Sequence, residues 1–153
     1  MSHTQSANKK RRILVVDDHA IVREGLTLLI NQEQDLEVCA TAENANDALE
    51  LIKKNNIDLA VVDISLNGTS GLQLTERMKA FNPHLPVLIL TMHDEELYAK
   101  RAFRAGAKGF VTKHEASQTI ITAIRMMLAG QSYVSDSMTQ KFLKKIHGDD
   151  TGY

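Results

Sequence analysis

Polar residues of the types that phosphoryl chemistry uses stand directly after four short apolar runs: Asp17, Asp18, Asp63, Thr91 and Lys113. The runs are rich in β-branched residues, which is typical of buried parallel strands. In an open parallel α/β sheet, ligands bind beyond the carboxyl ends of the strands. We therefore expect three carboxylates, a hydroxyl and an ammonium group to converge at one edge of one sheet.

Three crowded carboxylates resist simultaneous ionisation unless a cation lies among them. Mg²⁺ fits this group, because it is a hard ion that binds through one or two carboxylates, several waters and phosphate oxygens. A zinc site is not expected, because the six histidines are scattered and the single cysteine, Cys39, does not accompany them at a ligand spacing. The predicted metal is Mg²⁺.

The carboxylate of Asp63 can act as a nucleophile on a phosphoryl group and form an aspartyl phosphate. Lys113 can then pair with a phosphoryl oxygen, and Thr91 can donate a hydrogen bond to one. Both contacts form or strengthen only after phosphorylation, so these residues together predict a switch.

Alternating strands and helices must position these residues. The predicted strands are Arg12–Val16, Leu36–Thr41, Asp58–Val62, Val87–Thr91 and Gly109–Thr112. The predicted helices are Ala20–Asn31, Ala45–Lys54, Gly71–Phe81, Glu95–Ala105 and a last one from about Glu115 to Ala129. Five alternations without a long connecting loop predict an α/β fold with a doubly wound sheet and helices on both of its faces.

Local signals mark several ends of these elements. Asn44 and Ser70 are predicted N-caps, and Gly106 is a predicted left-handed C-cap. The polar, glycine-containing segment Ser65–Ser70 is expected to be a loop. Phe81, at the end of its helix, is expected to face the core.

The bulk composition is that of an ordinary globular chain. It has 153 residues, 43% of them hydrophobic and 24% charged, which fits one domain plus a tail. A formal net charge of −1 gives no global attraction to nucleic acid or membrane, so the basic run Lys9–Arg12 is expected to be solvated. With Cys39 expected to be a small buried residue, and with neither a signal peptide nor a membrane-spanning stretch, the expected location is the cytoplasm.

The chain resembles a receiver domain of two-component response regulators over about residues 11–130. The motifs that carry the resemblance are Val15-Val16-Asp17-Asp18, Val61-Val62-Asp63, Leu90-Thr91, and Lys113 after Gly109-Phe110-Val111-Thr112. The segments Ile89–Asp94 and Arg104–Phe110 are similar to the NarL/FixJ (LuxR-type) subfamily. The resemblance implies a flavodoxin-like (βα)5 fold with a five-stranded parallel sheet in the order 2-1-3-4-5.

The resemblance also implies roles for the acidic residues. Asp63 is then the phosphoacceptor for a sensor histidine kinase. Asp18 is a direct Mg²⁺ ligand, Asp17 is a ligand through water, and the backbone carbonyl of Ser65 is a further contact to the metal.

Three further residues match the switch of the family. Thr91 matches the switch hydroxyl, Lys113 the phosphate-binding lysine and Phe110 the aromatic rotamer switch. The chain departs from the family at two positions, where Asn67 and His114 replace prolines that many receivers have. Because a cis peptide before a residue other than proline is energetically costly, we expect a trans peptide before His114.

The expected organisation has three parts. Residues 1–10 form a disordered segment, residues 11–130 the receiver, and residues 131–153 a tail or linker helix. No room is left for a helix-turn-helix output domain, so the chain is interpreted as a receiver excised from a transcription regulator. The alternative is a stand-alone receiver that acts through protein partners, and in both cases this chain is not expected to bind specific DNA.

Two rival functions are weighed against the receiver. A Mg²⁺-dependent phosphohydrolase with an aspartate nucleophile needs a general acid two residues later, where Ser65 stands and cannot serve. A flavin-binding module needs a phosphate cradle after the first strand, where Asp17-Asp18 would repel phosphate. The predicted protein is therefore not an enzyme beyond slow self-dephosphorylation.

Extra apolar residues beside the core faces of two helices indicate a contact surface: Ile21, Leu28, Ile121 and Leu128. We expect a homodimer through the first and last receiver helices, modulated by phosphorylation. The alternative surface is the fourth helix, Glu95–Ala105, with the fifth strand and the fifth helix.

Overall fold

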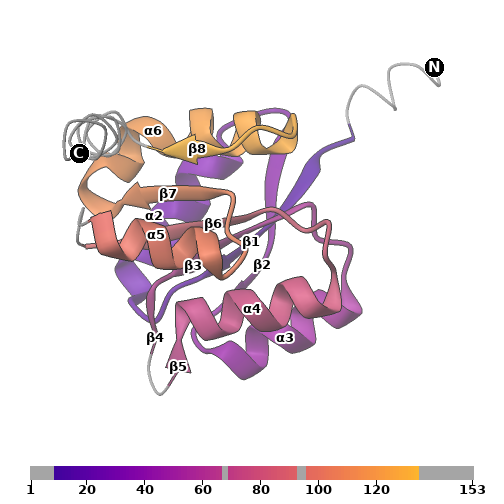
Figure 1. Ribbon diagram of the computed structural model, residues 1–153. Helices are drawn as coiled ribbons and strands as arrows, with labels where there is room; N and C mark the ends of the chain where they lie inside the picture. Colours follow the sequence, from indigo (N-terminus) through magenta and orange to yellow (C-terminus); the bar gives the residue numbers. More distant parts are fainter. Residues whose placement is uncertain (1–8, 67–68, 93–95, 135–153) are drawn as a thin grey trace.

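The computed structural model describes residues 9–66, 69–92 and 96–134, which form a parallel sheet covered by helices on both faces (Figure 1). The sheet has the order β2-β1-β3-β6-β7-β8. Its strands are β1 (Arg11–Val16), β2 (Leu36–Ala42), β3 (Leu59–Asp63), β6 (Val87–Thr91), β7 (Gly109–Thr112) and β8 (Tyr133–Val134). The helices are α2 (Ala20–Asn31), α3 (Ala45–Lys54), α4 (Gly71–Phe81), α5 (Glu96–Arg104) and α6 (Lys113–Leu128).

The fold is the predicted flavodoxin-like, doubly wound α/β fold, and its first five strands follow the predicted order 2-1-3-4-5. The predicted number of strands in this sheet was wrong by one, because the sheet has six strands and not five. The short strand β8 pairs in parallel with β7, and the backbone N–H of Tyr133 donates to the carbonyl of Lys108 at 2.9 Å. Two residues are too short a run to show a strand pattern in the sequence. The rest of the predicted tail helix, from residue 135 on, lies outside the described residues, as do residues 1–8.

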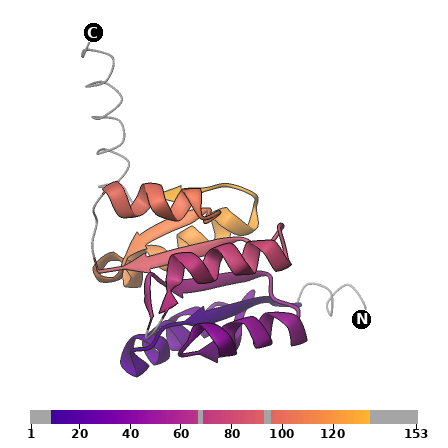
Figure 2. The same cartoon turned by 60° about the horizontal axis from the view of Figure 1, so that its bottom comes forward.

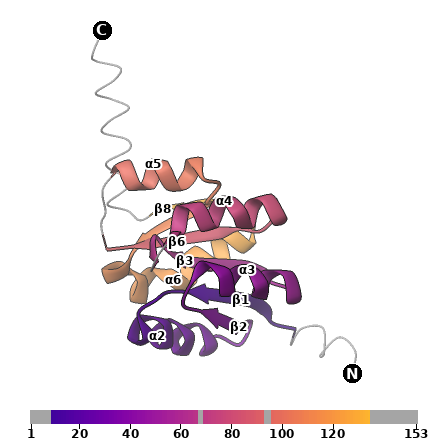
Figure 3. The same cartoon turned by 90° about the horizontal axis from the view of Figure 1, so that it is seen from below.

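Two apolar clusters hold the sheet between its helix layers. Alternate residues of β1 point to opposite faces: Leu14 and Val16 join the side chains of α3, α4 and α5, whereas Ile13 and Val15 join those of α2 and α6. Figures 2 and 3 show these two layers from other directions. Because both faces are covered, β3 is buried along its whole length. The central strands therefore hold their carboxyl ends in fixed positions.

Three predicted helix ends are confirmed. The side chain of Asn44 accepts a hydrogen bond from the backbone N–H of Asp47 at 2.8 Å. The side chain of Ser70 accepts one from the N–H of Leu72 at 3.1 Å. Gly106 follows α5 with a φ of +107°, a left-handed conformation that glycine adopts readily.

The last helix begins at Lys113, two residues before the predicted start. Thr112 stands at its N-cap position, and the Thr112 hydroxyl donates to a carboxylate oxygen of Glu115 at 2.5 Å. The sequence Thr112-x-x-Glu115 has the spacing of a capping box, although here the two side chains bond to each other. The peptide before His114 is trans, as expected.

Four other expectations need correction. Phe81 does not face the core but is 51% exposed, because it is the last residue of α4 and lies at the edge of the sheet layer. The segment Ser65–Ser70 contains two short antiparallel strands, β4 (Ser65–Leu66) and β5 (Thr69–Ser70). Ile121 and Leu128 are half-buried against the core and do not form a free stripe.

Cys39 is also only half-buried, because it lies on β2 at the edge of the sheet. Its thiol donates to the carbonyl oxygen of Ile13 at 3.6 Å. Burial raises the pKa of this thiol above its ordinary value, so it is a weak nucleophile.

Among the described residues, no helix has both the length and the apolar character needed to span a bilayer.

Gly71, the first residue of α4, lies close to the end of β3. Its backbone N–H donates to the carbonyl of Ile64 at 2.8 Å, and a Cβ at this position would lie 2.1 Å from the carbonyl oxygen of Asp63. We predict that Gly71→Ala lowers the free energy of unfolding by about 3 kcal/mol, the upper part of the range for overpacking, because the obstacle is backbone. Denaturant unfolding measures this change.

Gly25, inside α2, is the matched control. A Cβ there meets no atom within 4 Å, so Gly25→Ala should raise the free energy of unfolding by about 0.5–1 kcal/mol through helix propensity. Equal effects of the two substitutions would contradict the steric explanation.

Candidate functional site

The ends of β1 and β3 bring four potential ligand groups together. One ligand atom from each of Asp17, Asp18, His19 and Asp63 lies within 4.8 Å of the others. Asp17 and Asp63 are buried, and Asp18 is half-buried. The carboxylates therefore converge at the sheet edge where the strand ends predicted them.

Lys113 reaches the same group from the first turn of α6. Its Nζ lies 3.1 Å from Asp17 Oδ2 and 3.1 Å from Asp63 Oδ2, and only 8% of its side chain is exposed. A cation at the N-terminus of a helix is disfavoured by the helix dipole, so the two carboxylates are what stabilise its position. The ammonium thus bridges the ends of the two central strands.

The charge on Asp63 is unfavourable in this setting. Burial and then the nearby carboxylate of Asp17 raise the pKa of Asp63 above its ordinary value. The backbone N–H of Ser65, 3.2 Å from Asp63 Oδ1, and the Lys113 ammonium oppose this shift but do not cancel it. A further positive charge at the site would therefore stabilise the ionised form.

His19 is part of this cluster, and it was missed in the sequence, where it was considered only as a possible zinc ligand. Its Nδ1 lies 3.2 Å from a carboxylate oxygen of both Asp17 and Asp18, and 3.4 Å from Lys113 Nζ. A single ring nitrogen either donates to a carboxylate or accepts from the ammonium, according to its tautomer. The available signal was the position of His19, directly after the two aspartates.

Arg23 was also missed. Its guanidinium donates to the backbone carbonyl of Asp17 at 2.7 Å, one turn into α2. This bond ties the helix to the backbone that carries the acidic pair. Asp17 lies before the helix and Arg23 within it, so their separation of six residues gives no clear signal for such a contact in the sequence.

Thr91 ends β6, the strand beside β3, and Phe110 lies on β7, the next strand of the sheet. Asp63 pairs in register with Leu90 of β6, and Thr91 is the next residue of that strand. Thr91 in turn pairs with Thr112 of β7. Thr91 and Phe110 are both fully buried. Phe110 belongs to the apolar cluster that includes Ala99 and Ala102 of α5.

The donor set fits a hard cation such as Mg²⁺. Asp17 Oδ2 and Asp18 Oδ1 are buried and have no hydrogen bond, although each has a nitrogen at ion-pair distance, Lys113 Nζ at 3.1 Å and His19 Nδ1 at 3.2 Å. Buried carboxylate oxygens without hydrogen bonds are uncommon and are natural ligands of a divalent ion. Asp17, Asp18 and Asp63 are the residues that would hold it. The role given to the Ser65 carbonyl stays a prediction.

Comparison with known proteins decides the family. The sequence profile of the response regulator receiver domain matches residues 13–125. The chain belongs to the response regulator receiver domain family. This receiver fold is seen in the crystal structure of a LuxR-family two-component response regulator from Aurantimonas sp. SI85-9A1, with 35% identity, a TM-score of 0.85, and coverage of 90% of this chain and 98% of that one.

Two further relatives support the NarL/FixJ (LuxR-type) subfamily, which is thereby confirmed. The receiver is 30% identical to the signal receiver domain of NarL from Mycobacterium tuberculosis, with a TM-score of 0.76 over 80% of this chain and 99% of that one. It is 34% identical over 144 residues to the oxygen regulatory protein NreC of Staphylococcus haemolyticus. That match covers 91% of this chain but 66% of NreC, so the chain spans less than two thirds of this curated relative.

The raised pKa of Asp63 predicts a stability effect. Between the ordinary carboxyl value of 3.8 and the raised value in the receiver, the folded state binds more protons than the unfolded state, so stability falls as pH rises through this window. We predict that Asp63→Asn, in metal-free buffer at neutral pH, raises stability by about 1 kcal/mol, or about 2–4 °C in Tm. The gain should shrink as the pH falls toward the ordinary carboxyl range.

Asp35→Asn is the matched control with the opposite sign. The Arg125 guanidinium, 2.8 Å from Asp35, lowers the pKa of that exposed carboxyl, so its contribution is present above pH 3.8 and is lost on acidification. This substitution should leave Tm unchanged or lower it slightly. Thermal melts across pH test both, and an Asp63→Asn variant less stable than the wild type at neutral pH would contradict the prediction.

Proposed function

We propose that this receiver accepts a phosphoryl group on Asp63 from a sensor histidine kinase and thereby switches the activity of a DNA-binding output domain in transcription regulation. The observation that carries the proposal is the carboxylate of Asp63, buried at the end of the central strand beside Lys113 and two carboxylates with unsatisfied oxygens. The proposal extends the family assignment to individual residues.

The reaction is a phosphoryl transfer between two side chains. A carboxylate oxygen of Asp63 forms a bond to phosphorus as the P–N bond to the kinase histidine breaks, and the histidine ring keeps the electron pair. The Lys113 ammonium lies 3.1 Å from Asp63 Oδ2 in the unphosphorylated receiver, and it can form an ion pair with a phosphoryl oxygen instead. The product is an aspartyl phosphate with its new negative charge close to Lys113.

Asp17, Asp18 and Asp63 are proposed to hold Mg²⁺, with the Ser65 backbone carbonyl as a further contact. When bound, the ion offsets the repulsion between the attacking carboxylate and the phosphoryl group. His19 shares space with these carboxylates, but its side chain is 64% exposed and can turn toward solvent. The described contacts of His19 are therefore compatible with loading of the metal.

The proposed switch consists of Thr91 and Phe110. A phosphoryl group on Asp63 offers an oxygen to the Thr91 hydroxyl, which follows on the adjacent strand. Movement of Thr91 toward the phosphoryl group frees space under α5, into which Phe110 can rotate. The surface of α5 and β7 would then change, and a partner that binds only one of the two forms would read the phosphorylation.

Regulation of transcription belongs to the proposal because of the relatives. The LuxR-family assignment and the coverage of NreC support an output domain beyond the matched region. DNA recognition is assigned to that domain and not to residues 11–130. A stand-alone receiver that acts through protein contacts is the alternative, and a Mg²⁺-dependent phosphohydrolase is disfavoured because Ser65 cannot act as the general acid.

The phosphoacceptor is tested by phosphorylation with acetyl phosphate and Mg²⁺, detected by intact mass. We predict that the wild type takes up one phosphoryl group and that Asp63→Ala takes up none, because it lacks the attacking oxygen. Asp18→Asn should lower the labelling rate at least about tenfold, since it removes a metal ligand. Asp47→Asn, an exposed change of the same kind on α3, is the control and should label normally.

Equal labelling of the wild type and Asp63→Ala would remove Asp63 from its proposed role. Labelling of the wild type at the same rate in EDTA would remove Mg²⁺ from the mechanism. Rapid turnover of a phosphomonoester such as p-nitrophenyl phosphate would revive the phosphohydrolase alternative.

A homodimer is proposed through α2, where Ile21 is 85% exposed and Leu28 is 69% exposed. Exposed large apolar residues on one helix are typical of a contact surface. We predict that Ile21→Asp with Leu28→Asp prevents dimerisation of the acetyl-phosphate-treated chain, measured by sedimentation equilibrium. Leu97→Asp, on the exposed side of α5, is the matched control and should leave the dimer intact.

The reverse result, with Leu97→Asp monomeric and the α2 variant dimeric, would assign the interface to the alternative face of α5, β7 and α6. A wild-type monomer both with and without acetyl phosphate would contradict either dimer.

A further inference from the structure

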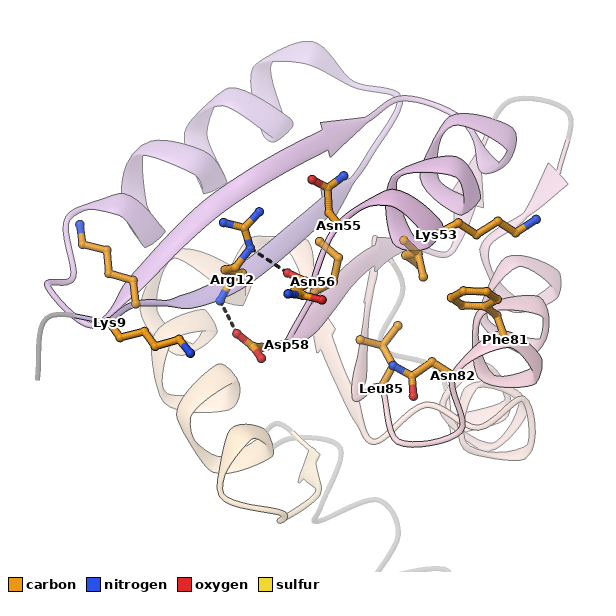
Figure 4. A pocket seen from close by; sticks show the side chains of 12 residues that line it. Lys9, Arg12, Lys53, Asn55, Asn56, Asp58, Phe81, Asn82 and Leu85 are labelled. Carbon is orange, nitrogen blue, oxygen red and sulfur yellow. Dashed lines mark hydrogen bonds between the residues drawn. The ribbon is translucent and has the colours of Figure 1, made fainter. Parts of the chain in front are cut away.

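A cavity of about 510 Å³ opens at the amino ends of β1 and β3, the edge of the sheet opposite the acidic cluster (Figure 4). Its volume lies within the usual range of small-molecule sites. Its walls come from three places in the chain: the residues that lead into β1, the turn after α3, and the end of α4 with the turn that follows. The phosphoryl chemistry proposed above uses none of these residues.

The rim of the cavity is cationic. Lys9, Lys10 and Lys53 line it and are exposed, and their side chains have no hydrogen bond or ion pair within the described part of the chain. Asp58, the single acidic residue in the lining, is already engaged: Asp58 Oδ2 accepts from the backbone N–H of Arg12 at 2.7 Å and lies 3.7 Å from Arg11 Nε. In Figure 4 Lys9 and Lys53 lie at opposite ends of the cavity, so positive charge stands at both ends of its rim.

The inner wall is apolar and includes an aromatic ring. Phe81 is the large exposed residue that the sequence pattern placed in the core, and in Figure 4 it lies on the same wall as Leu85. Ile52 and Ile57 complete this wall. A half-exposed phenyl ring beside cationic side chains suits a ligand with a planar ring and an anionic group.

The ends of α3 and α4 could oppose an anion, because the C-terminal carbonyls of helices carry partial negative charge. Part of that charge is taken up by local donors. The backbone N–H and the side-chain amide of Asn55 both donate to the carbonyl of Leu51, and the N–H of Asn82 donates to that of Met78. Lys53, in the last turn of α3, offsets more of it.

We propose that this cavity binds a nucleoside phosphate, with its base against Phe81 and its phosphates at the lysine side chains of the rim. Base-on-aromatic contacts tolerate different bases, so Phe81 provides affinity for the ring and the lysines select for phosphate. The ligand sits at the starts of the two strands whose ends carry Asp17 and Asp63. Binding there is independent of phosphorylation at Asp63.

The test uses ADP as the probe and backbone amide chemical shifts of the full 153-residue chain in EDTA. We expect shifts for residues 52–58, 81, 82, 84 and 85 and none for residues 17–19 and 63. Adenosine and pyrophosphate, each carrying half of the recognised chemistry, should bind at least about fivefold more weakly than ADP. A single-stranded hexathymidylate is the fourth ligand, because a nucleic acid offers the same groups.

Lys53→Glu and Phe81→Ala should each weaken ADP binding about tenfold. Their matched controls are Lys54→Glu, the same charge change one residue on and outside the lining, and Leu97→Ala, an exposed apolar residue on α5. Both controls should bind ADP like the wild type. All four variants should still be labelled by acetyl phosphate, which shows that they fold.

The proposal is overturned if ADP causes no shifts at about 1 mM, a concentration at which even a weak specific site would be partly occupied. It is also overturned if the shifts lie at residues 17–19 and 63, or if the Lys53 and Phe81 variants bind ADP like their controls. Tighter binding of hexathymidylate than of ADP would assign the surface to nucleic acid and reject the free nucleotide. Loss of labelling at Asp63 in the wild type, with ADP binding intact, would count against the proposed function alone.

Discussion

The receiver depends on one electrostatic conflict: Asp17 and Asp63 are buried side by side and share the ammonium of Lys113. Like charges at the edge of a sheet repel each other, and burial weakens the solvation that would reduce this repulsion. The raised pKa of Asp63 is the sign of this conflict. A divalent cation would therefore stabilise the unphosphorylated site. Once the cation is bound, reaction of the Asp63 carboxylate with an electrophile would remove one of the crowded carboxylate charges.

The two carboxylates stay close together because the rest of the fold prevents the strand ends from moving apart. β1 and β3 are covered on both faces, so a movement of either strand end would open the apolar clusters. Lys113 is fixed by the start of α6, where Thr112 and Glu115 bond to each other. Arg23 holds the backbone of Asp17 from α2. Hydrophobic burial thus maintains an arrangement that its charges alone would not favour.

The strands and their polar ends could be predicted because both signals are local: a β-branched run and the residue that follows it. The convergence at Asp17, Asp63 and Lys113 then followed from the geometry of parallel strands. The start of α6 was missed because the helix was predicted from the period of its apolar residues. The contact between Thr112 and Glu115, which marks the start, adds nothing to that period. Phe81 was placed in the core because its helical period is correct, although the period does not tell where the sheet stops. β8 depends on pairing with β7, which is distant in sequence, so no local pattern contains it. His19 stands directly after the two aspartates, but the fold is needed to bring it near Asp63 and Lys113.

The approach of Gly71 to Asp63 has a consequence for how receivers of this kind can diverge. The bond from the N–H of Gly71 to the carbonyl of Ile64 closes the ends of the segment between them. When the two ends of a segment are held together in this way, a change in its length alters the entropic cost of closing it only slightly. The positions between Ile64 and Gly71 can therefore vary in evolution, and tune how water or a partner reaches the phosphoryl group, while the position of Asp63 stays the same.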